Sequence, residues 1–448
     1  MKLTSLIAGL ILPHHPNVAT PELAASEQYN LLNFLGGSGP YFQYSGYGIS
    51  PLAPPQCQVD QAYLIGRHGE RFPTGNSGIE YNSTIHHLKG QSLNGTLEFL
   101  TQYEFFVTDS NNFDQEVTLN NSDSIYSGSL SAHRDGESFR RIYGHLYDPS
   151  TIFPVFSTNS RRCYDTSVNF IKGFMGDEYN TRKVKFNIMG EDSSTGANSL
   201  TPRQGCLGFQ QAKIAKYKQY TRHFAQIRTR LQVENPTLNI SDTQIGNLFD
   251  ACAYEINVKG HSQLCGIFTN NELVSNEYNK DVSLYHEVGA GNRFSQAAGS
   301  PLVRSLLQLL HDKSNPQKLW ISFTHDYDLV TLYTALSLFT DHLDAKEIQF
   351  DRQFTKSHII PQSTRLIVER LACGGNTYVR IILNDSVLPM RCKYGPGFSC
   401  SLQEVSAMLE PVVSMEYNDQ CDNRDLQRAE LTFYWDYDEV EYNAPLFP

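Results

Sequence analysis

Three short apolar runs have the length and composition of buried β-strands, at residues 62–65, 154–156 and 319–323. Each run ends in a polar turn. The second and third turns are followed by apolar residues at helical spacing, over residues 168–174 and 329–339. Repeated units of strand, polar turn and helix predict an α/β fold, in which ligands bind outside the carboxyl ends of the strands.

Other segments complete the expected fold. Runs at residues 365–371 and 378–383 have strand patterns and are expected to extend the sheet. Residues 86–145 and 206–285 are polar and helical in pattern, which predicts a discontinuous helical domain that caps the sheet. Residues 13–60 are rich in Pro, Gly and Tyr and are expected to form an irregular arm over the surface.

The predicted fold class is therefore α/β, with two packing units in a chain of 448 residues. The larger unit is expected to hold a central mixed sheet flanked by helices, and the smaller one is a mainly helical insertion domain, with the active site between them. The larger unit is assigned residues 20–85, 146–205 and 286–448, and the insertion is assigned residues 86–145 and 206–285.

Composition narrows the function classes. The chain carries 47 acidic against 36 basic residues, a net charge of −11, which excludes a strongly basic nucleic-acid binder. Hydrophobic residues make up 40% of the chain, which is enough for a globular core. We expect no nucleic-acid partner.

The N-terminus has the pattern of a secretory signal. Lys2 is followed by the apolar residues 3–12, which stop at Pro13, and this predicts a signal peptide over residues 1–19. A buried first helix is the alternative. No other segment approaches the roughly 20 apolar residues that span a bilayer. We therefore expect a secreted protein, extracellular or associated with the cell wall, without a membrane partner.

Sequons and cysteines agree with an oxidising, extracellular compartment. Nine cysteines, with no Cys-x-x-Cys pair and no zinc-finger spacing, predict four disulfides and one thiol and give no indication of a metal site. Cys163 is the best candidate for the free thiol, because it opens a predicted helix on an apolar stretch. The sequons predict glycan acceptors at Asn82, Asn94, Asn120, Asn239 and Asn384.

The polar turn after the first strand carries candidate chemistry in Arg67, His68 and Arg71. Two guanidiniums on one turn can converge on a tetrahedral oxyanion, and an imidazole between them then points at the same centre. Their positive charge favours a neutral imidazole, the form that can attack phosphorus. The alternative is that both arginines pair with acids such as Glu70 and that His68 is structural.

The segment RHGERFPT at residues 67–74 resembles the signature of the histidine acid phosphatases, and the pair His325 and Asp326 resembles the second motif of that family. The resemblance extends to residues 36–40, 157–162 and 289–292. It is greatest to the branch of secreted yeast acid phosphatases and fungal phytases. That resemblance implies hydrolysis of small phosphomonoesters at acid pH.

Family roles carry over to matching positions. The resemblance implies that His68 is the nucleophile and forms a phosphohistidine, and that Asp326 protonates the leaving alkoxide. No cofactor and no metal are implied. The choice of Arg162 over Arg161 rests on its offset from Ser157. The implied ligands of the phosphoryl oxygens are Arg67, Arg71, Arg162 and His325.

Structural roles for the two residues of the second motif remain as alternatives to catalytic roles. Asp326 could cap a helix, although Asp328 is better placed to do so, and His325 could bond to the backbone at the end of the sheet. The resemblance also implies disulfide pairs, which spacing alone does not determine. These pairs are Cys57 with Cys373, Cys206 with Cys421, Cys252 with Cys265, and Cys392 with Cys400, which leaves Cys163 free.

Substrate preference divides phytases from broad phosphomonoesterases. Thr74 and the cations His86, His87 and Lys89 could form a substrate mouth for a polyphosphate, or could be a solvated helix surface. Two other classes remain as alternatives: a mutase-like phosphotransferase, and a non-catalytic secreted binding glycoprotein. The sequence leaves a homo-oligomer open.

Overall fold

The computed structural model describes residues 30–213, 218–423 and 428–447, so the predicted signal peptide lies outside the described residues. A mixed sheet forms its centre, with β1 (Cys57–Arg67) parallel to β4 (Leu319–Thr324) and antiparallel to β5 (Arg365–Cys373). The strand order is β3-β2-β4-β1-β5-β6-β7, with β8 beside β6. The other strands are β2 (Phe153–Thr158), β3 (Val184–Met189), β6 (Asn376–Leu383), β7 (Ser386–Leu388) and β8 (Cys400–Ser401).

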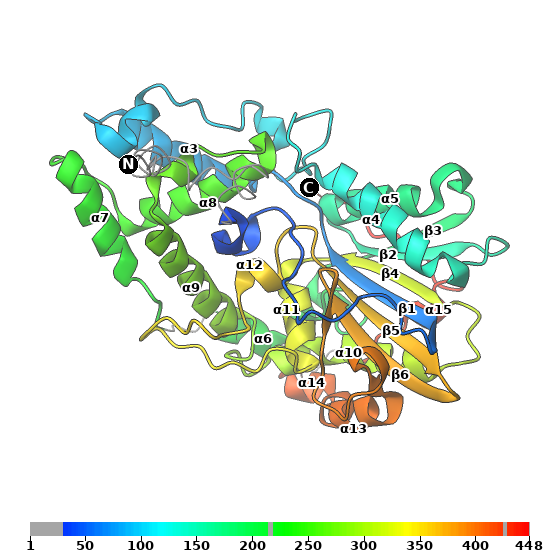
Figure 1. The fold of residues 1–448 in the computed structure, drawn as a ribbon. Coiled ribbons are helices and arrows are strands. Elements are labelled where there is room, and N and C mark those ends of the chain that lie inside the picture. The colour runs from blue at the N-terminus through cyan, green and yellow to red at the C-terminus, as the bar shows by residue number, and fades with distance from the viewer. Residues whose placement is uncertain (1–29, 214–217, 424–427, 448) are drawn as a thin grey trace, which may run out of the picture.

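Both faces of the sheet are covered, which explains why β1 is a continuous apolar run. Side chains alternate along a strand, so Ala62 and Leu64 face the core beneath α4 (Gly128–Tyr143) and α5 (Arg161–Met175). Tyr63 and Ile65 face the opposite core, under α10 (Ser295–His311), α11 (Asp326–Ala335) and α13 (Leu402–Val413). Figure 1 shows helices on both faces of the sheet. The predicted fold class is confirmed.

A separate apolar core holds the helices drawn at the left of Figure 1. It joins α3 (Gly75–Lys89), α7 (Arg222–Glu234), α8 (Asp242–Lys259) and the first half of α9 (Asn270–Glu287). Helices α8 and α9 each begin with a capping box, and α8 ends at Gly260, whose φ of 77° favours glycine. These helices therefore have strong local start and stop signals.

The boundaries assigned to the insertion domain need correction. Residues 128–143 form α4, which packs on α5 against the sheet instead of joining the helical core. Two glycines allow the close approach: a Cβ at Gly136 would lie 1.9 Å from Phe170 O, and a Cβ at Gly173 would lie 1.9 Å from His133 O. Helix α3, which crosses the assigned boundary at residue 86, instead belongs to the helical core.

Residues 13–29 of the predicted arm lie outside the described residues. From residue 30 to β1 the arm is irregular as predicted, but residues 31–40 are largely buried and do not lie over the surface. Leu31 and Leu35 enter the helical core, around η1 (Leu31–Phe34) and η2 (Gly36–Ser38). The backbone N–H of Gly36 donates to Glu277 Oε2 at 2.6 Å. The hydrophobic residues of the arm therefore place a glycine turn inside the molecule.

Four disulfides join the pairs that the family resemblance implied, and Cys163 is a buried free thiol. One sequon prediction is wrong. Asn384 is fully buried, its Nδ2 donates to His358 O at 3.0 Å and its Oδ1 accepts from Arg365 N at 3.1 Å, so no glycan can be attached there. Asn94, Asn120 and Asn239 are exposed, and Asn82 is partly exposed.

No helix within the described residues combines the length and apolar character needed to cross a membrane. Short helices and 3-10 turns connect the layers. The remaining helices are α6 (Leu207–Lys213), α12 (Lys356–Ile359), α14 (Tyr417–Gln420) and α15 (Phe433–Asp436). The remaining 3-10 turns are η3 (Gly95–Thr101), η4 (Ser110–Asn112), η5 (Gly144–Leu146), η6 (Gly176–Glu178), η7 (Ser193–Thr195), η8 (Pro202–Gly205), η9 (Leu264–Ile267) and η10 (Pro396–Phe398).

Candidate active site

The two sequence motifs meet because β1 and β4 are parallel neighbours. Arg67 and Thr324 are paired in register at the ends of these strands, and His68 N donates to Thr324 O at 3.2 Å. His68 and His325, which follow the two strands, lie with ring centroids 5.9 Å apart. The motifs therefore form one cluster at the carboxyl edge of the sheet, where α/β proteins bind ligands.

His68 is held as a neutral imidazole with a free nitrogen. Its side chain is buried, and Nδ1 lies 2.9 Å from Gly69 O. A carbonyl can only accept, so Nδ1 carries the proton and Nε2 carries the lone pair. Burial, followed by the charges of Arg67, Arg162 and Arg71, holds the pKa of His68 well below its usual range. Nε2 is therefore a nucleophile at acid pH.

Arg67 is fixed by three partners from distant parts of the chain. Its Nη1 donates to Gly37 O at 2.6 Å and to Ile360 O at 2.7 Å, and its Nη2 donates to Asp326 Oδ2 at 2.8 Å. The glycine turn of the arm is thus part of the site. A Cβ at Gly37 would lie 2.8 Å from Ile360 O, so the close approach requires glycine.

Arg71 connects the site to the helical core. Its backbone N–H donates to Gln362 Oε1 at 2.8 Å, its Nη1 donates to Phe72 O at 2.8 Å, and its guanidinium lies 5.3 Å from the centre of the Tyr254 ring on α8. The predicted position of the active site, between the sheet and the helical part, follows from these contacts.

The structure distinguishes the two adjacent arginines at the start of α5. Arg161 is exposed, and its Nε donates to Asp165 Oδ1 at 3.0 Å and to Oδ2 at 2.9 Å. Arg162 turns toward the cluster, where its charge lowers the pKa of both His68 and His325. Arg162 is therefore the arginine of this pair that faces the nucleophile.

Three guanidinium nitrogens in the cluster have no partner among the described residues: Nε of Arg67, of Arg71 and of Arg162. A buried N–H without a partner is costly. Guanidinium donors around one imidazole match the requirements of a tetrahedral oxyanion, because each can bond a phosphoryl oxygen. The arrangement is that of a phosphoryl-binding cluster around a nucleophilic histidine.

His325 is bound by a carboxylate that the sequence patterns did not reveal. Its Nε2 lies 2.7 Å from Glu191 Oε1, and the Cys163 Sγ lies 3.7 Å from its Nδ1. Burial lowers the pKa of His325, and the hydrogen bond and charge of Glu191 oppose that shift. Glu191 follows β3, an alternating run that was not among the predicted strands, so nothing in the pattern placed it at this edge.

Asp326 is an ion-pair partner in the cluster, not a helix cap. Burial alone would raise its pKa, but the charges of Arg67 and then Lys356 outweigh burial and hold it well below the usual range. Helix α11 begins at Asp326 after His325, without a side-chain cap. Asp328 is fully buried and pairs with Arg203 at 3.0 Å, so it does not cap the helix either.

The residues proposed for a substrate mouth are not brought together. Thr74 caps α3, accepting from Ser77 N at 3.4 Å. The three cations lie in the last turn of α3, about 18 Å along the helix. There His86 is exposed, His87 Nε2 lies 2.9 Å from Asn239 O, and Lys89 Nζ donates to Tyr103 O at 2.8 Å. The mouth is therefore not formed by these residues.

Glu116 ties the loop of the nucleophile to the helix of Arg162. Its Oε1 contacts Thr166 Oγ1 and accepts from Gly69 N at 3.1 Å. Thr166 Oγ1 also accepts from Gly69 N at 2.8 Å, and its single proton has two acceptors in reach, Glu116 Oε1 and Arg162 O, the latter at 2.8 Å. Burial, the largest cause, raises the pKa of Glu116 to about 8.

We expect Glu116 to make the fold more stable in acid. A folded-state pKa of about 8 against an ordinary 4.5 means that this stabilisation is complete below pH 4.5 and is lost as pH rises through 8. The side chain in Glu116→Gln is neutral at every pH. The free energy of unfolding of this variant should therefore change between pH 4 and 8 by on the order of 1–3 kcal/mol less than that of the wild type, as measured by thermal unfolding scans. The exposed Glu178→Gln is the control. An unchanged pH dependence in Glu116→Gln would show that the carboxyl is ionised.

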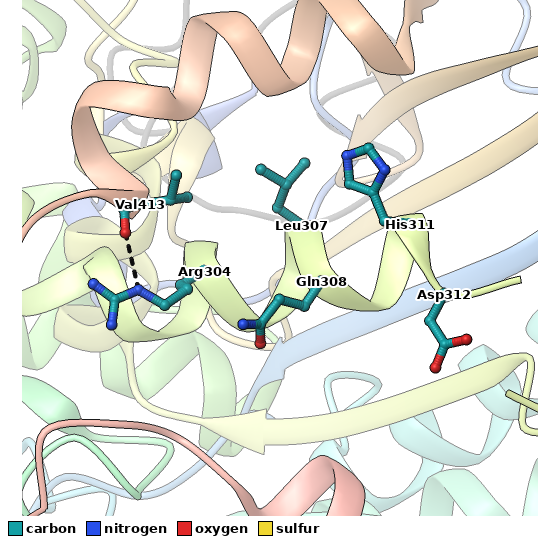
Figure 2. Close-up of a pocket in the computed structure, with 6 residues that line it drawn as sticks. All are labelled: Arg304, Leu307, Gln308, His311, Asp312 and Val413. Carbon is teal, nitrogen blue, oxygen red and sulfur yellow. Dashed lines mark hydrogen bonds between the residues drawn. The ribbon is translucent and has the colours of Figure 1, made fainter. Parts of the chain in front are cut away.

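A hollow elsewhere in the molecule also contains an arginine and a histidine, but their side chains are differently bound. It measures about 560 Å³, between α10 and α13, and is lined by Arg304, Leu307, Gln308, His311, Asp312 and Val413 (Figure 2). Arg304 Nε donates to Val413 O at 3.0 Å, and its Nη2 donates to Met415 O. Its guanidinium is thus already bound to backbone, and the imidazole of this hollow, His311, has its Nε2 2.7 Å from Ser406 Oγ. This hollow is not a second phosphoryl site.

The sheet edge and its histidine and arginine cluster define a phosphoryl-transfer enzyme of the α/β class. The family model of the histidine phosphatase superfamily (branch 2) matches residues 58–384. The chain belongs to this family. It is an enzyme of the phosphomonoester hydrolase class, and the resemblance inferred from the two motifs is confirmed.

Relatives match over nearly the full chain. A phytase of Candida albicans is 43% identical over 96% of this chain and 95% of its own. A repressible acid phosphatase of Saccharomyces cerevisiae is 37% identical over 94% and 92%, respectively. The crystal structure of the phytase from D. castellii has a TM-score of 0.90 and 41% identity, covering 97% of each chain.

Proposed function

We propose that this enzyme is a secreted acid phosphatase that works through a phosphohistidine on His68 and accepts phytate among its substrates. The observation that carries the proposal is the lone pair of His68 Nε2 in a cluster with a carboxyl group and three guanidiniums whose Nε atoms are buried and have no partner among the described residues. A binding protein has no need of a neutral imidazole held in a cationic cluster.

The first half-reaction transfers the phosphoryl group to histidine. The substrate oxygens bind Arg67, Arg71 and Arg162, whose charges offset the negative charge on the phosphoryl oxygens. Nε2 of His68 forms a bond to phosphorus while the ester P–O bond breaks. The leaving alkoxide takes a proton from Asp326, because an unprotonated alkoxide is a poor leaving group.

Substrate binding prepares Asp326 for this step. Without substrate, Arg67 Nη2 donates to Asp326 Oδ2 at 2.8 Å and stabilises the carboxylate. A dianionic phosphoryl group next to Arg67 offsets that charge and raises the pKa of Asp326. Asp326 then holds a proton when the leaving oxygen arrives.

The second half-reaction returns the enzyme to its starting state. Asp326, now a carboxylate, takes a proton from water while the water oxygen attacks phosphorus. The bond between Nε2 and phosphorus breaks, phosphate leaves, and Asp326 is again protonated. Because guanidiniums supply the cationic charge, no step needs a metal ion.

Phytate hydrolysis and secretion are proposed on separate grounds. The phytase and the acid phosphatase match 96% and 94% of this chain, and phytate hydrolysis is proposed from the 43% identity to the phytase. Secretion is proposed from the signal pattern, the four disulfides and the exposed sequons at Asn94, Asn120 and Asn239. A broad-specificity acid phosphatase with little preference for phytate is the alternative, because two acid phosphatases are 37% and 36% identical to this chain.

Phosphate release at about pH 4–5 tests the proposal, measured in parallel from phytate and p-nitrophenyl phosphate with and without EDTA. We expect release from both substrates, with EDTA causing no loss. Release from p-nitrophenyl phosphate alone would remove phytate from the proposal. No release from either substrate would contradict the phosphatase mechanism.

A further inference from the structure

A second cation, Lys356, lies on the leaving-group side of the cluster. The charge of Lys356 lowers the pKa of Asp326, and among the neighbouring charges only that of Arg67 has a larger effect. A Cβ built on Gly37 would lie 3.2 Å from Lys356 Cε and 3.3 Å from Arg67 Nη1, so the two cationic side chains flank one glycine. Lys356 therefore stands beside both the proton donor and a phosphoryl ligand.

The backbone around Lys356 is rigidly held. Lys356 N donates to Asp281 Oδ1 at 2.6 Å, and Ser357 N donates to Glu277 Oε1 at 2.8 Å, both acids being buried on α9. Glu277 Oε2 also accepts from Gly36 N at 2.6 Å. Glu277 thus joins the glycine turn to the start of α12, and Asp281 holds that start as well. A side chain carried on a backbone fixed in this way can select among substrates by position.

The ammonium of Lys356 has no ion pair or hydrogen bond among the described residues, although the residue is partly buried. The neighbouring Lys280 differs, because its Nζ donates to Asp250 Oδ2 at 2.8 Å. Burial and then the charge of Lys280 lower the pKa of Lys356. A partly buried cation without a partner is costly, and an anionic ligand group would offset that cost.

We propose that Lys356 Nζ binds a second phosphate of the substrate, next to the ester that is cleaved, and so favours polyphosphorylated polyols over monophosphates. The position supports this, because Asp326 marks the leaving oxygen. A cation beside Asp326 is therefore placed to meet substituents of the leaving alcohol. In a hexakisphosphate, both carbons next to the cleaved ester carry such a phosphate. This inference rests on the proposed phosphatase function.

Substrate ratios in Lys356→Met test the inference. We expect kcat/KM for inositol hexakisphosphate to fall at least about 10-fold, roughly the loss of one charge-assisted bond, while kcat/KM for glycerol phosphate, an alkyl monophosphate that needs the same proton from Asp326, changes less than about 2-fold. Lys356→Arg keeps the charge and should recover most of the hexakisphosphate activity. The exposed Lys346→Met, whose ammonium lies 3.9 Å from Asp344, is the control and should change neither.

Each other outcome has a distinct meaning. Equal losses on both substrates would show that Lys356 acts through Asp326, and the inference would be overturned. No loss on either substrate would overturn it as well. If the wild-type enzyme released no phosphate from p-nitrophenyl phosphate, the proposed function itself would fail, which the monophosphate assay detects independently of Lys356.

Discussion

His68→Ala should lower kcat/KM at least about 10⁴-fold on every phosphomonoester, because it removes the atom that bonds to phosphorus. The guanidiniums of Arg67, Arg71 and Arg162 remain, so substrate and inorganic phosphate should still bind. Initial rates at pH 5 with p-nitrophenyl phosphate and phytate measure the loss. Rapid quenching with a radiolabelled ester should label the wild-type protein and leave the variant unlabelled.

Folding must be monitored, since His68 is buried. His68→Asn keeps more of the side-chain volume and should be equally inactive, with an unfolding midpoint close to that of the wild type. His145→Ala is a matched control, because its Nε2 lies 3.0 Å from Val59 O, away from the cluster. Residual activity above about 1% in a folded His68 variant would rule out a covalent intermediate on this residue.

Asp326→Asn should separate substrates by their leaving groups. An amide cannot give a proton to an alkoxide, so we expect a loss of about 10²–10⁴-fold on glycerol phosphate and phytate. The loss on p-nitrophenyl phosphate should be at least about 10-fold smaller, since p-nitrophenolate leaves without protonation. Steady-state kinetics on the alkyl and aryl esters give the ratio.

The control for Asp326→Asn must account for the broken ion pair with Arg67. Inorganic phosphate inhibition reports phosphoryl binding by Arg67 and should change little compared with the catalytic loss on alkyl esters. Equal losses on alkyl and aryl esters would show that Asp326 only orients Arg67 and donates no proton to the leaving group. A general acid elsewhere in the cluster would then be required.

Local sequence determines the nucleophile loop and the strand that precedes it. The apolar run of β1 needs two covered faces, and RHGERFPT follows it directly, so Arg67, His68 and Arg71 were found from the sequence. The same holds for β4 with His325 and Asp326. Cys163 was also predicted correctly as the unpaired thiol, from its place at the start of a helix on an apolar stretch.

The sequence failed where the decision depended on distant neighbours. Asn384 matches a sequon, but the turn between β6 and β7 buries its amide. The cations His86, His87 and Lys89 follow the first motif closely, yet α3 carries them to the far end of a 15-residue helix. Glycines 136 and 173 direct α4 onto the sheet, although its polar pattern favoured the helical cap.

The sequence alone therefore determined the reactive groups and the family, because these depend on residues adjacent in the chain and on strand periodicity. Only the tertiary structure decided which further groups share the site. Glu191, Glu116 and Lys356 are brought there by β3, by the segment before α4, and by α12. The physical reason is that an electrostatic field and a hydrogen-bond network depend on distances in space, which packing of the sheet and helices sets and local sequence does not.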